Sequence, residues 1–166
     1  MGGDTLNLDL GAAILPDAGL GGLQLRCHII DAQGLFSDRW GKNARLSSFS
    51  LLSPFEAEYR FLAGAISAYI DVRTGKIFML SAAGGYRGNL LGKIYVGQSM
   101  GEANSAEPRL YYDESEAAVF CREVEGLSIN LSEADPSPAR VPELRIATIN
   151  VYARETRSLR AQGGRW

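Results

Sequence analysis

Apolar and polar residues alternate most regularly in the stretch from Ile66 to Val72. Strict alternation with a period of two is typical of a β-strand that has one buried face. The stretch is followed by Arg73-Thr74-Gly75 and then by the run Lys76 to Leu80, which predicts a β-hairpin closed by a short turn. Glycine at the end of such a turn can take the left-handed conformation that other residues resist. We expect Asp71 to accept hydrogen bonds from the turn amides, and we interpret it and its basic neighbours as turn chemistry rather than as an acid–base pair.

The same alternation predicts further strands along the chain. They are expected at residues 4–10, 23–29, 93–96, 110–113, 117–122, 127–131 and 144–151, with Gly97 ending the third of them. In residues 144–151 both alternating sets contain apolar side chains, which favours a central position in the sheet. Residues 11–22, 84–89 and 132–142 are rich in glycine or proline and are expected to form loops or turns.

Helix signals are short. Ser99-Met100-Gly101-Glu102 is a capping-box pattern that predicts a helix over about 99–105, ended by Pro108. Residues 31–53 are irregular in pattern and are expected to form a long loop, with a single helical turn at most, held to the core by scattered apolar side chains. The basic segment from Arg154 onward predicts a short frayed helix, and residues 155–166 are expected to be a frayed or disordered tail.

Two signals compete just before the hairpin. Ser53-Pro54-Phe55-Glu56 matches a helix start, with a capping serine, an early proline and a glutamate at the third position. Tyr59, Phe61 and Ala63 alternate like a strand that runs into the hairpin. We expect a helical turn at 54–57, then a strand from residue 59 with a bulge near Gly64.

Together these elements predict an α+β fold, namely a mainly antiparallel, twisted β-sheet with one or two short helices. A chain of 166 residues favours a single domain, residues 1–166. A domain of this size buries an ordinary hydrophobic core without needing disulfides or metals.

Charge and composition exclude some classes of function. The formal net charge is −2 and the isoelectric point is about 5.5, whereas nucleic-acid binding needs a concentrated basic surface. No apolar run approaches the ~20 residues that a membrane-spanning helix needs. The N-terminal residues lack the basic and apolar regions of a signal peptide, so we expect a cytoplasmic protein.

Familiar catalytic patterns are missing from the sequence. His28, the single histidine, has no obvious serine or cysteine partner and no metal-ligand residues at short spacing. Cys27 and Cys121 are expected to be buried and reduced, although a disulfide between them is left open. The P-loop, Gly-x-Ser-x-Gly and dinucleotide-binding patterns are absent. We therefore predict no enzymatic activity, no cofactor and no metal; the carboxylates that acid–base catalysis could use are Asp71, Asp113, Glu114 and Glu116.

Several segments between residues 65 and 131 follow a wider pattern. They are Ala65–Asp71, Thr74–Ile77, Gly85–Gly88, Gly92–Ser99 and Leu110–Glu114. Their succession of a hairpin, a Tyr-basic-Gly loop, a strand ending in glycine and a short helix resembles small bacterial proteins that are encoded beside secreted toxins. The resemblance implies a cytoplasmic immunity protein that blocks the active site of a cognate toxin, in interbacterial competition such as that driven by type VI secretion. Immunity proteins occur on many folds, so the fold does not by itself identify one.

An immunity protein needs a rigid scaffold and a charged, aromatic surface patch for fast and tight association. The residues expected to supply this patch are Tyr86, Arg87, Tyr111, Tyr112, Asp113, Glu114 and Glu116. The competing interpretation makes the tyrosines half-buried sheet residues with solvated hydroxyls. An alternative function is a small enzyme or a ligand-binding domain with its pocket between the sheet and the 31–53 loop.

Overall fold

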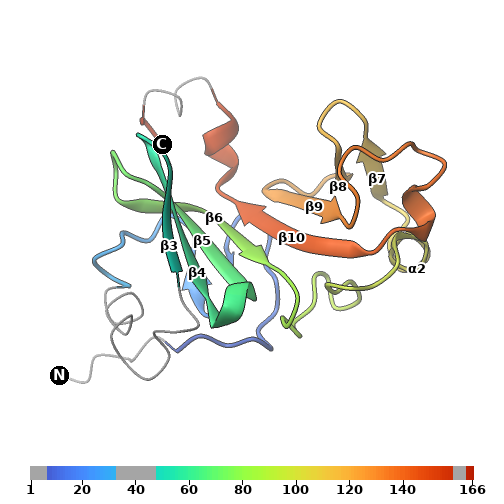
Figure 1. Ribbon diagram of the computed structural model, residues 1–166, viewed down its shortest axis with the longest axis horizontal. Coiled ribbons are helices and arrows are strands. Elements are labelled where there is room, and N and C mark those ends of the chain that lie inside the picture. The colour runs from blue at the N-terminus through green and yellow to red at the C-terminus, as the bar shows by residue number, and fades with distance from the viewer. Residues whose placement is uncertain (1–6, 33–47, 159–163) are drawn as a thin grey trace.

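The computed structural model describes residues 7–32, 48–158 and 164–166 (Figure 1). This part of the chain is mostly antiparallel β-sheet with one α-helix, which agrees with the predicted sheet-dominated α+β class. The elements are β1 (Gly19–Leu20), β2 (Leu23–Gln24), β3 (Ser48–Ser53), β4 (Glu56–Phe61), β5 (Ile66–Asp71), β6 (Lys76–Ala82), α2 (Met100–Ala106), β7 (Leu110–Asp113), β8 (Ala118–Cys121), β9 (Leu127–Leu131) and β10 (Ile146–Tyr152). Short 3-10 helices lie at Leu62–Gly64, Val141–Glu143 and Arg154–Arg157.

Eight strands form one sheet in the order β3-β4-β5-β6-β10-β9-β8-β7. Every pairing in it is antiparallel. The predicted strand at 144–151 becomes β10, which lies between β6 and β9, so its predicted central position is confirmed. Figure 1 shows β3 to β6 on one side of the molecule and β7 to β9 on the other, with the long β10 connecting them. β1 and β2 pair separately as a two-stranded sheet.

One face of the large sheet forms the hydrophobic core. Alternate residues of the strands, such as Ile66, Leu80, Ile129 and Ile149, are fully buried on it. The layer that covers this face consists of residues 10–32, the loop that follows β6, and α2. It contributes the buried side chains Ile14, Leu20, Leu23, Leu25, Tyr86, Leu90, Ile94 and Met100. The other residues of the same strands are therefore left to the opposite face of the sheet.

The β5–β6 hairpin has the predicted turn. Gly75 has a φ of 68°, and its N–H donates to the Asp71 carbonyl at 2.8 Å. The Asp71 carboxylate accepts from the Arg73 backbone N–H at 2.9 Å and from the Arg73 guanidinium at 2.8 and 2.9 Å. The Trp166 indole N–H donates to the same carboxylate at 2.9 Å. Asp71 is 3% exposed, so its interpretation as a structural turn residue is confirmed by these contacts.

These donors make the hairpin sensitive to acid. The bonds from Arg73, reinforced by Trp166, hold the pKa of Asp71 at about 2, although burial opposes them. A carboxyl whose pKa is lower in the folded state contributes stability above its unfolded pKa of about 4 and loses it as the pH falls toward 2. We expect Asp71→Asn to lower the free energy of unfolding by about 2 kcal/mol at pH 7 and by roughly half of that at pH 3. Urea denaturation at both pH values tests this, and an equal loss at pH 7 and pH 3 would contradict the charge-based explanation.

The capping box at α2 is formed as predicted. The Ser99 hydroxyl accepts from the Glu102 N–H at 3.3 Å, and the Glu102 carboxylate accepts from the Ser99 N–H at 3.3 Å. Met100 and Ala103 are the buried residues of the helix, so its first turn is fixed to the core. The predicted strands at 110–113, 117–122 and 127–131 are also present, as β7, β8 and β9.

The segment before the hairpin differs from the prediction. Residues 48–53 form β3 rather than part of a loop, and the helical turn predicted at 54–57 is absent: residues 54 and 55 are the turn of a β3–β4 hairpin, and residues 56 and 57 belong to β4. The Ser53 hydroxyl accepts from the Phe55 N–H at 3.2 Å, which is a bond that closes a turn as readily as it begins a helix. β4 begins at Glu56, and the irregularity expected near Gly64 is a 3-10 helix with Ala63 at a φ of 57°.

Three predicted strands are absent or shortened. Residues 93–96 form only an isolated bridge between Leu90 and Ile94, because Leu91 and Gly92 have φ values of 54° and 74° and fold the chain back within four residues. Residues 7–10 are not a strand, and residues 4–6 lie outside the described residues. The strand expected at 23–29 is limited to β2, since Arg26 has a φ of 67°.

The remaining expectations concern the two cysteines, the 31–53 segment and membrane-spanning helices. Cys27 is half-buried and Cys121 is buried, and both are free thiols whose pKa is raised by burial. The part of the predicted 31–53 loop at 33–47 lies outside the described residues. Among the described helices, none has the length and apolar character needed to cross a membrane.

Candidate binding surface around the β7–β8 hairpin

The face of the sheet opposite the core is hollowed into a groove of about 450 Å³. Its lining is a mixture of hydroxyl, amide and aromatic side chains from the central strands and from the 3-10 helix at 154–157. The residues are Tyr69, Phe78, Met79, Ser81, Glu116, Ala118, Phe120, Ser128, Asn130, Thr148, Asn150, Tyr152, Thr156 and Arg157. We call this hollow the polar groove.

The floor of the polar groove is an uncharged hydrogen-bonded row. The Ser81 hydroxyl donates to the Asn150 side-chain oxygen at 2.5 Å, and the Asn150 amide donates to the Ser128 hydroxyl at 3.3 Å. Ser81 and Asn150 are both buried. The nearby Thr148 hydroxyl oxygen is buried and has no hydrogen-bond partner among the described residues. Buried polar atoms without partners destabilise a fold, so losing either the Ser81–Asn150 bond or the Asn150–Ser128 bond would destabilise the floor of the groove.

Arg157 closes one end of the polar groove. Its guanidinium donates to the Tyr152 hydroxyl at 3.3 Å and to the Glu116 carboxylate at 3.3 Å, and it lies 5.5 Å from the centre of the Phe120 ring. Both members of the Arg157–Glu116 pair are more than half exposed, so the pair contributes little to stability. Arg157 and Glu116 can therefore form ion pairs with a binding partner instead of with each other.

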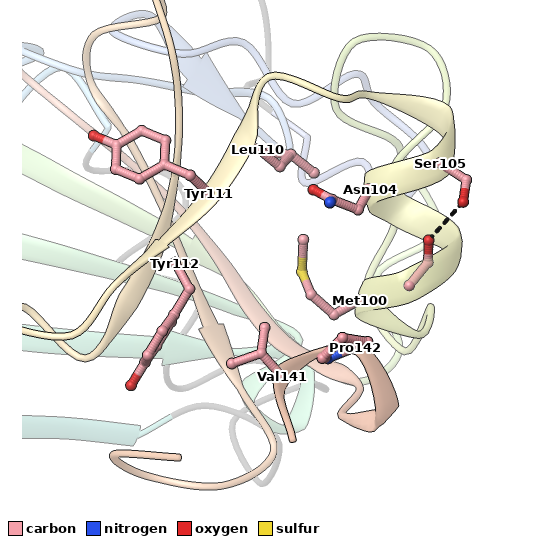
Figure 2. Close-up of a pocket in the computed structure, with 9 residues that line it drawn as sticks. Met100, Asn104, Ser105, Leu110, Tyr111, Tyr112, Val141 and Pro142 are labelled. Atoms are coloured by element: carbon pink, nitrogen blue, oxygen red, sulfur yellow. Dashed lines mark hydrogen bonds between the residues drawn. The ribbon is translucent and has the colours of Figure 1, made fainter. Parts of the chain in front are cut away.

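The β7–β8 hairpin borders the polar groove and presents Tyr111 beside it. Tyr111 pairs with Phe120 across the two strands, and their ring centres are 6.1 Å apart. The Arg122 guanidinium lies 5.9 Å from the Tyr111 ring centre, and 41% of Tyr111 remains exposed. Tyr112 packs against the hydrophobic core instead. Neighbouring residues of a strand point to opposite faces, and Figure 2 shows the two tyrosines leaving β7 in opposite directions.

A second hollow, of about 260 Å³, lies on the other side of the hairpin (Figure 2). It separates β7 from α2 and from the segment before β10. Its lining residues are Met100, Gly101, Asn104, Ser105, Leu110, Tyr111, Tyr112, Val141 and Pro142. Figure 2 shows Met100 reaching from α2 into this space, with Val141 and Pro142 at its lower edge. The hairpin is thus a ridge between two hollows.

The acidic residues of the hairpin divide into two kinds. The Asp113 carboxylate accepts from the Ser115 hydroxyl at 2.6 Å and from the Ser115 and Glu116 backbone N–H groups at 2.9 and 3.4 Å. These bonds, the Ser115 hydroxyl first, lower the pKa of Asp113. Asp113 therefore holds the turn, whereas the exposed side chains of Glu114 and Glu116 carry the outward negative charge.

The remaining two candidate residues lie elsewhere. Tyr86 is only 5% exposed, and its hydroxyl accepts from the Gly21 N–H and donates to the Ala12 carbonyl, both at 2.8 Å. Arg87 is exposed, but it lies on the covering layer, where its N–H donates to the Leu10 carbonyl at 2.7 Å. Tyr86 is too buried to contact a partner and Arg87 lies on the covering layer, so the candidate surface consists of the polar groove and the hairpin without these two residues.

Other candidates for chemistry are dispersed in the described part of the chain. No cluster there contains three or more His, Cys, Asp or Glu residues that could hold a metal ion. His28 accepts a hydrogen bond from the Ile30 N–H at its Nδ1 atom, at 3.2 Å, and its ring lies against Gly75 at the hairpin turn. The polar groove was not predicted from the sequence, because its lining residues come from several separate strands.

Comparisons with known proteins do not assign the chain to a family. No family model matches the sequence, and no curated protein matches it. Among solved structures it is similar to the uncharacterized protein yfeY from Escherichia coli, with 14% sequence identity and a TM-score of 0.46. That similarity covers 64% of this chain and 79% of that chain.

Proposed function

We propose that this protein is a cytoplasmic immunity protein that binds a cognate secreted bacterial toxin and blocks its active site, with the β7–β8 hairpin as the centre of contact. The observation that carries the proposal is the position of Tyr111, Glu114 and Glu116. They combine a partly exposed aromatic ring and two outward carboxylates on a ridge between two hollows. The sequence resemblance described above supports the same function.

The physical character of this ridge suits protein recognition. Exposed aromatic side chains in the middle of a contact surface dominate binding energy, because they bury large areas at little entropic cost. The carboxylates complement a basic cleft of the kind that enzymes acting on nucleic acids or nucleotides present, and they accelerate association. The hairpin belongs to the eight-stranded sheet, so the surface is held rigid before the partner arrives.

Reversing the two outward charges tests the electrostatic part of this proposal. We expect the double variant Glu114→Lys/Glu116→Lys to associate with the toxin about tenfold more slowly at low salt, with a smaller difference at 0.5 M salt, because screening shortens the range of the charges. Folding should be almost unchanged, since substitutions of exposed charges shift stability by about 0.5 kcal/mol or less. Stopped-flow association kinetics at several salt concentrations provide the measurement.

The chain offers a matched control for this experiment. Asp31→Lys/Glu125→Lys changes the net charge by the same amount at exposed positions away from the hairpin. Glu125 also loses an exposed ion pair, at 3.2 Å to Arg154, just as Glu116 loses its pair with Arg157. Equal slowing in both double variants would assign the effect to net charge, and the hairpin would lose its proposed role.

A second candidate function is the binding of a small polar ligand in the polar groove. Its volume of about 450 Å³ lies within the ~300–1,000 Å³ typical of ligand pockets. The groove is lined by residues outside the 31–53 segment, so this pocket is not the one expected from the sequence. Glu114 does not line the groove, so a ligand bound to its floor would be insensitive to Glu114→Lys alone, whereas the proposed toxin would associate more slowly with that variant, and this distinguishes the two functions.

A further inference from the structure

The outermost strand at the other end of the sheet, β3, is unusually apolar for an exposed edge. Its sequence from Ser48 to Ser53 contains neither a charged residue nor proline. Phe49, Leu51 and Leu52 are 43%, 64% and 50% exposed. β3 pairs with β4 on one side and has no strand partner on the other among the described residues. An edge of this kind is a template for pairing with another strand.

The opposite edge of the same sheet shows how such a template is normally protected. β7 has four residues, ends in Asp113 and leads directly into Glu114. Short length and charge at an edge are standard ways in which proteins prevent strand addition. β3 has six residues and neither of these protections. Its composition is therefore suited to a partner strand.

We propose that β3 pairs antiparallel with β3 of a second copy of this chain. Antiparallel pairing of two identical strands has two-fold symmetry, so each copy gives and receives the same contacts. The partner edge must lack charge, because a charged strand would lose solvation without compensation beside Phe49 and Leu51. The uncharged β3 of another copy meets that requirement, and self-pairing places no like charges opposite each other.

The register within one copy shows which surface the pairing extends. Phe49 and Leu51 pair with Tyr59 and Ala57 of β4, and the Phe49 and Tyr59 ring centres are 4.7 Å apart. A second β3 would continue this row and cover the exposed apolar side chains. The two hairpins of the proposed function would lie at the outer ends of the joined sheet, because β3 and β7 are the two edges of the sheet. Pairing at β3 therefore leaves both hairpins free, and the inference does not depend on the toxin.

Sedimentation equilibrium of the full chain tests the pairing. We expect a concentration-dependent shift from the monomer mass of 18.0 kDa to twice that value. Leu51→Lys should raise the dissociation constant of the dimer at least about tenfold, because it places a charged side chain in the apolar surface that the pairing covers. The control is Ile30→Lys, at a side chain that is 67% exposed and outside β3, which should leave the dissociation constant unchanged.

Cysteine cross-linking identifies the contact strand. Ser50→Cys, near the middle of the strand, should form an intermolecular disulfide in the dimer, in preference to the wild type, which retains Cys27 and Cys121 under the same oxidation. Circular dichroism confirms that each variant is folded. A monomer at all concentrations would overturn the proposal. So would a dimer that Leu51→Lys does not weaken, or β3 cross-links that form only with the toxin present.

Discussion

Replacing Tyr111 with alanine is expected to weaken binding of the toxin by about 2–4 kcal/mol, which is the range found for central aromatic residues of protein interfaces. The Tyr111 ring packs beside the Phe120 ring and the Arg122 guanidinium, so it is ordered before binding and loses little entropy on contact. It lines the second hollow and adjoins the polar groove through Phe120, so a partner covering the ridge would bury it. Isothermal titration calorimetry with the purified toxin domain measures the loss.

The control for Tyr111→Ala is Tyr95→Ala. Tyr95 is 48% exposed, similar to Tyr111, but it lies on the loop before α2 and lines neither hollow. We expect Tyr95→Ala to bind the toxin as tightly as the wild-type protein. Unchanged affinity for Tyr111→Ala would place the toxin on another surface.

Replacing Gly88 with alanine is expected to lower the free energy of unfolding by about 2–4 kcal/mol, at the upper end of the cost of overpacking. A Cβ atom at this position would lie 1.8 Å from the Ala12 carbonyl oxygen and 2.7 Å from the Tyr86 ring. The Gly88 N–H also donates to the Leu10 carbonyl at 2.9 Å, so the backbone cannot move away without breaking a bond. The close approach of Gly88 to Ala12 holds the loop after β6 against residues 10–32, and relief of the clash would separate these two parts of the covering layer.

Gly84→Ala is the matched control in the same loop. Apart from its two chain neighbours, no described residue has an atom within 4 Å of a Cβ placed there, and its φ is not left-handed. Alanine at such a site reduces the freedom of the unfolded chain, so we expect stability to be unchanged or to rise by up to about 1 kcal/mol. Thermal or urea denaturation of both variants provides the comparison, and equal stability of Gly88→Ala and Gly84→Ala would contradict the close approach at Ala12.

The parts of the fold that sequence predicts are those determined by local contacts. Asp71 and Gly75 define the hairpin turn within five residues, and Ser99 and Glu102 define the start of α2 within four. The strands β7, β8 and β9 follow one another through short turns, so their alternation is not interrupted. Each of these signals is complete within its own stretch of chain.

The parts that sequence mispredicts depend on contacts that local patterns do not report. The Ser53 hydroxyl forms a bond that serves a hairpin turn and a helix start equally well. β3 has apolar side chains that remain exposed, so it lacks the alternation of a half-buried strand. Ile94 is buried and Tyr95 exposed, as in a strand, but the left-handed residues before them leave no neighbouring strand to pair with.

The candidate surface also has one part that local sequence predicts and another part that depends on contacts between distant segments. The composition of residues 111–116 identifies the hairpin ridge, and the period of a strand correctly separates Tyr111 from Tyr112. The polar groove depends on how β6, β9 and β10 lie side by side, since Ser81, Ser128 and Asn150 come from strands far apart in the sequence. Sequence also does not distinguish Tyr86, whose hydroxyl is used inside the fold, from an exposed tyrosine.

Hydrogen–deuterium exchange of the protein with and without a candidate cognate toxin domain tests the central claim most directly. The proposed function predicts a stable complex in which the backbone amides of residues 110–118 exchange more slowly, while those of the Arg87 loop at residues 84–89 exchange as in the free protein. A stable complex without slower exchange at residues 110–118 would contradict the role of the hairpin, and the absence of a complex would contradict the immunity function itself.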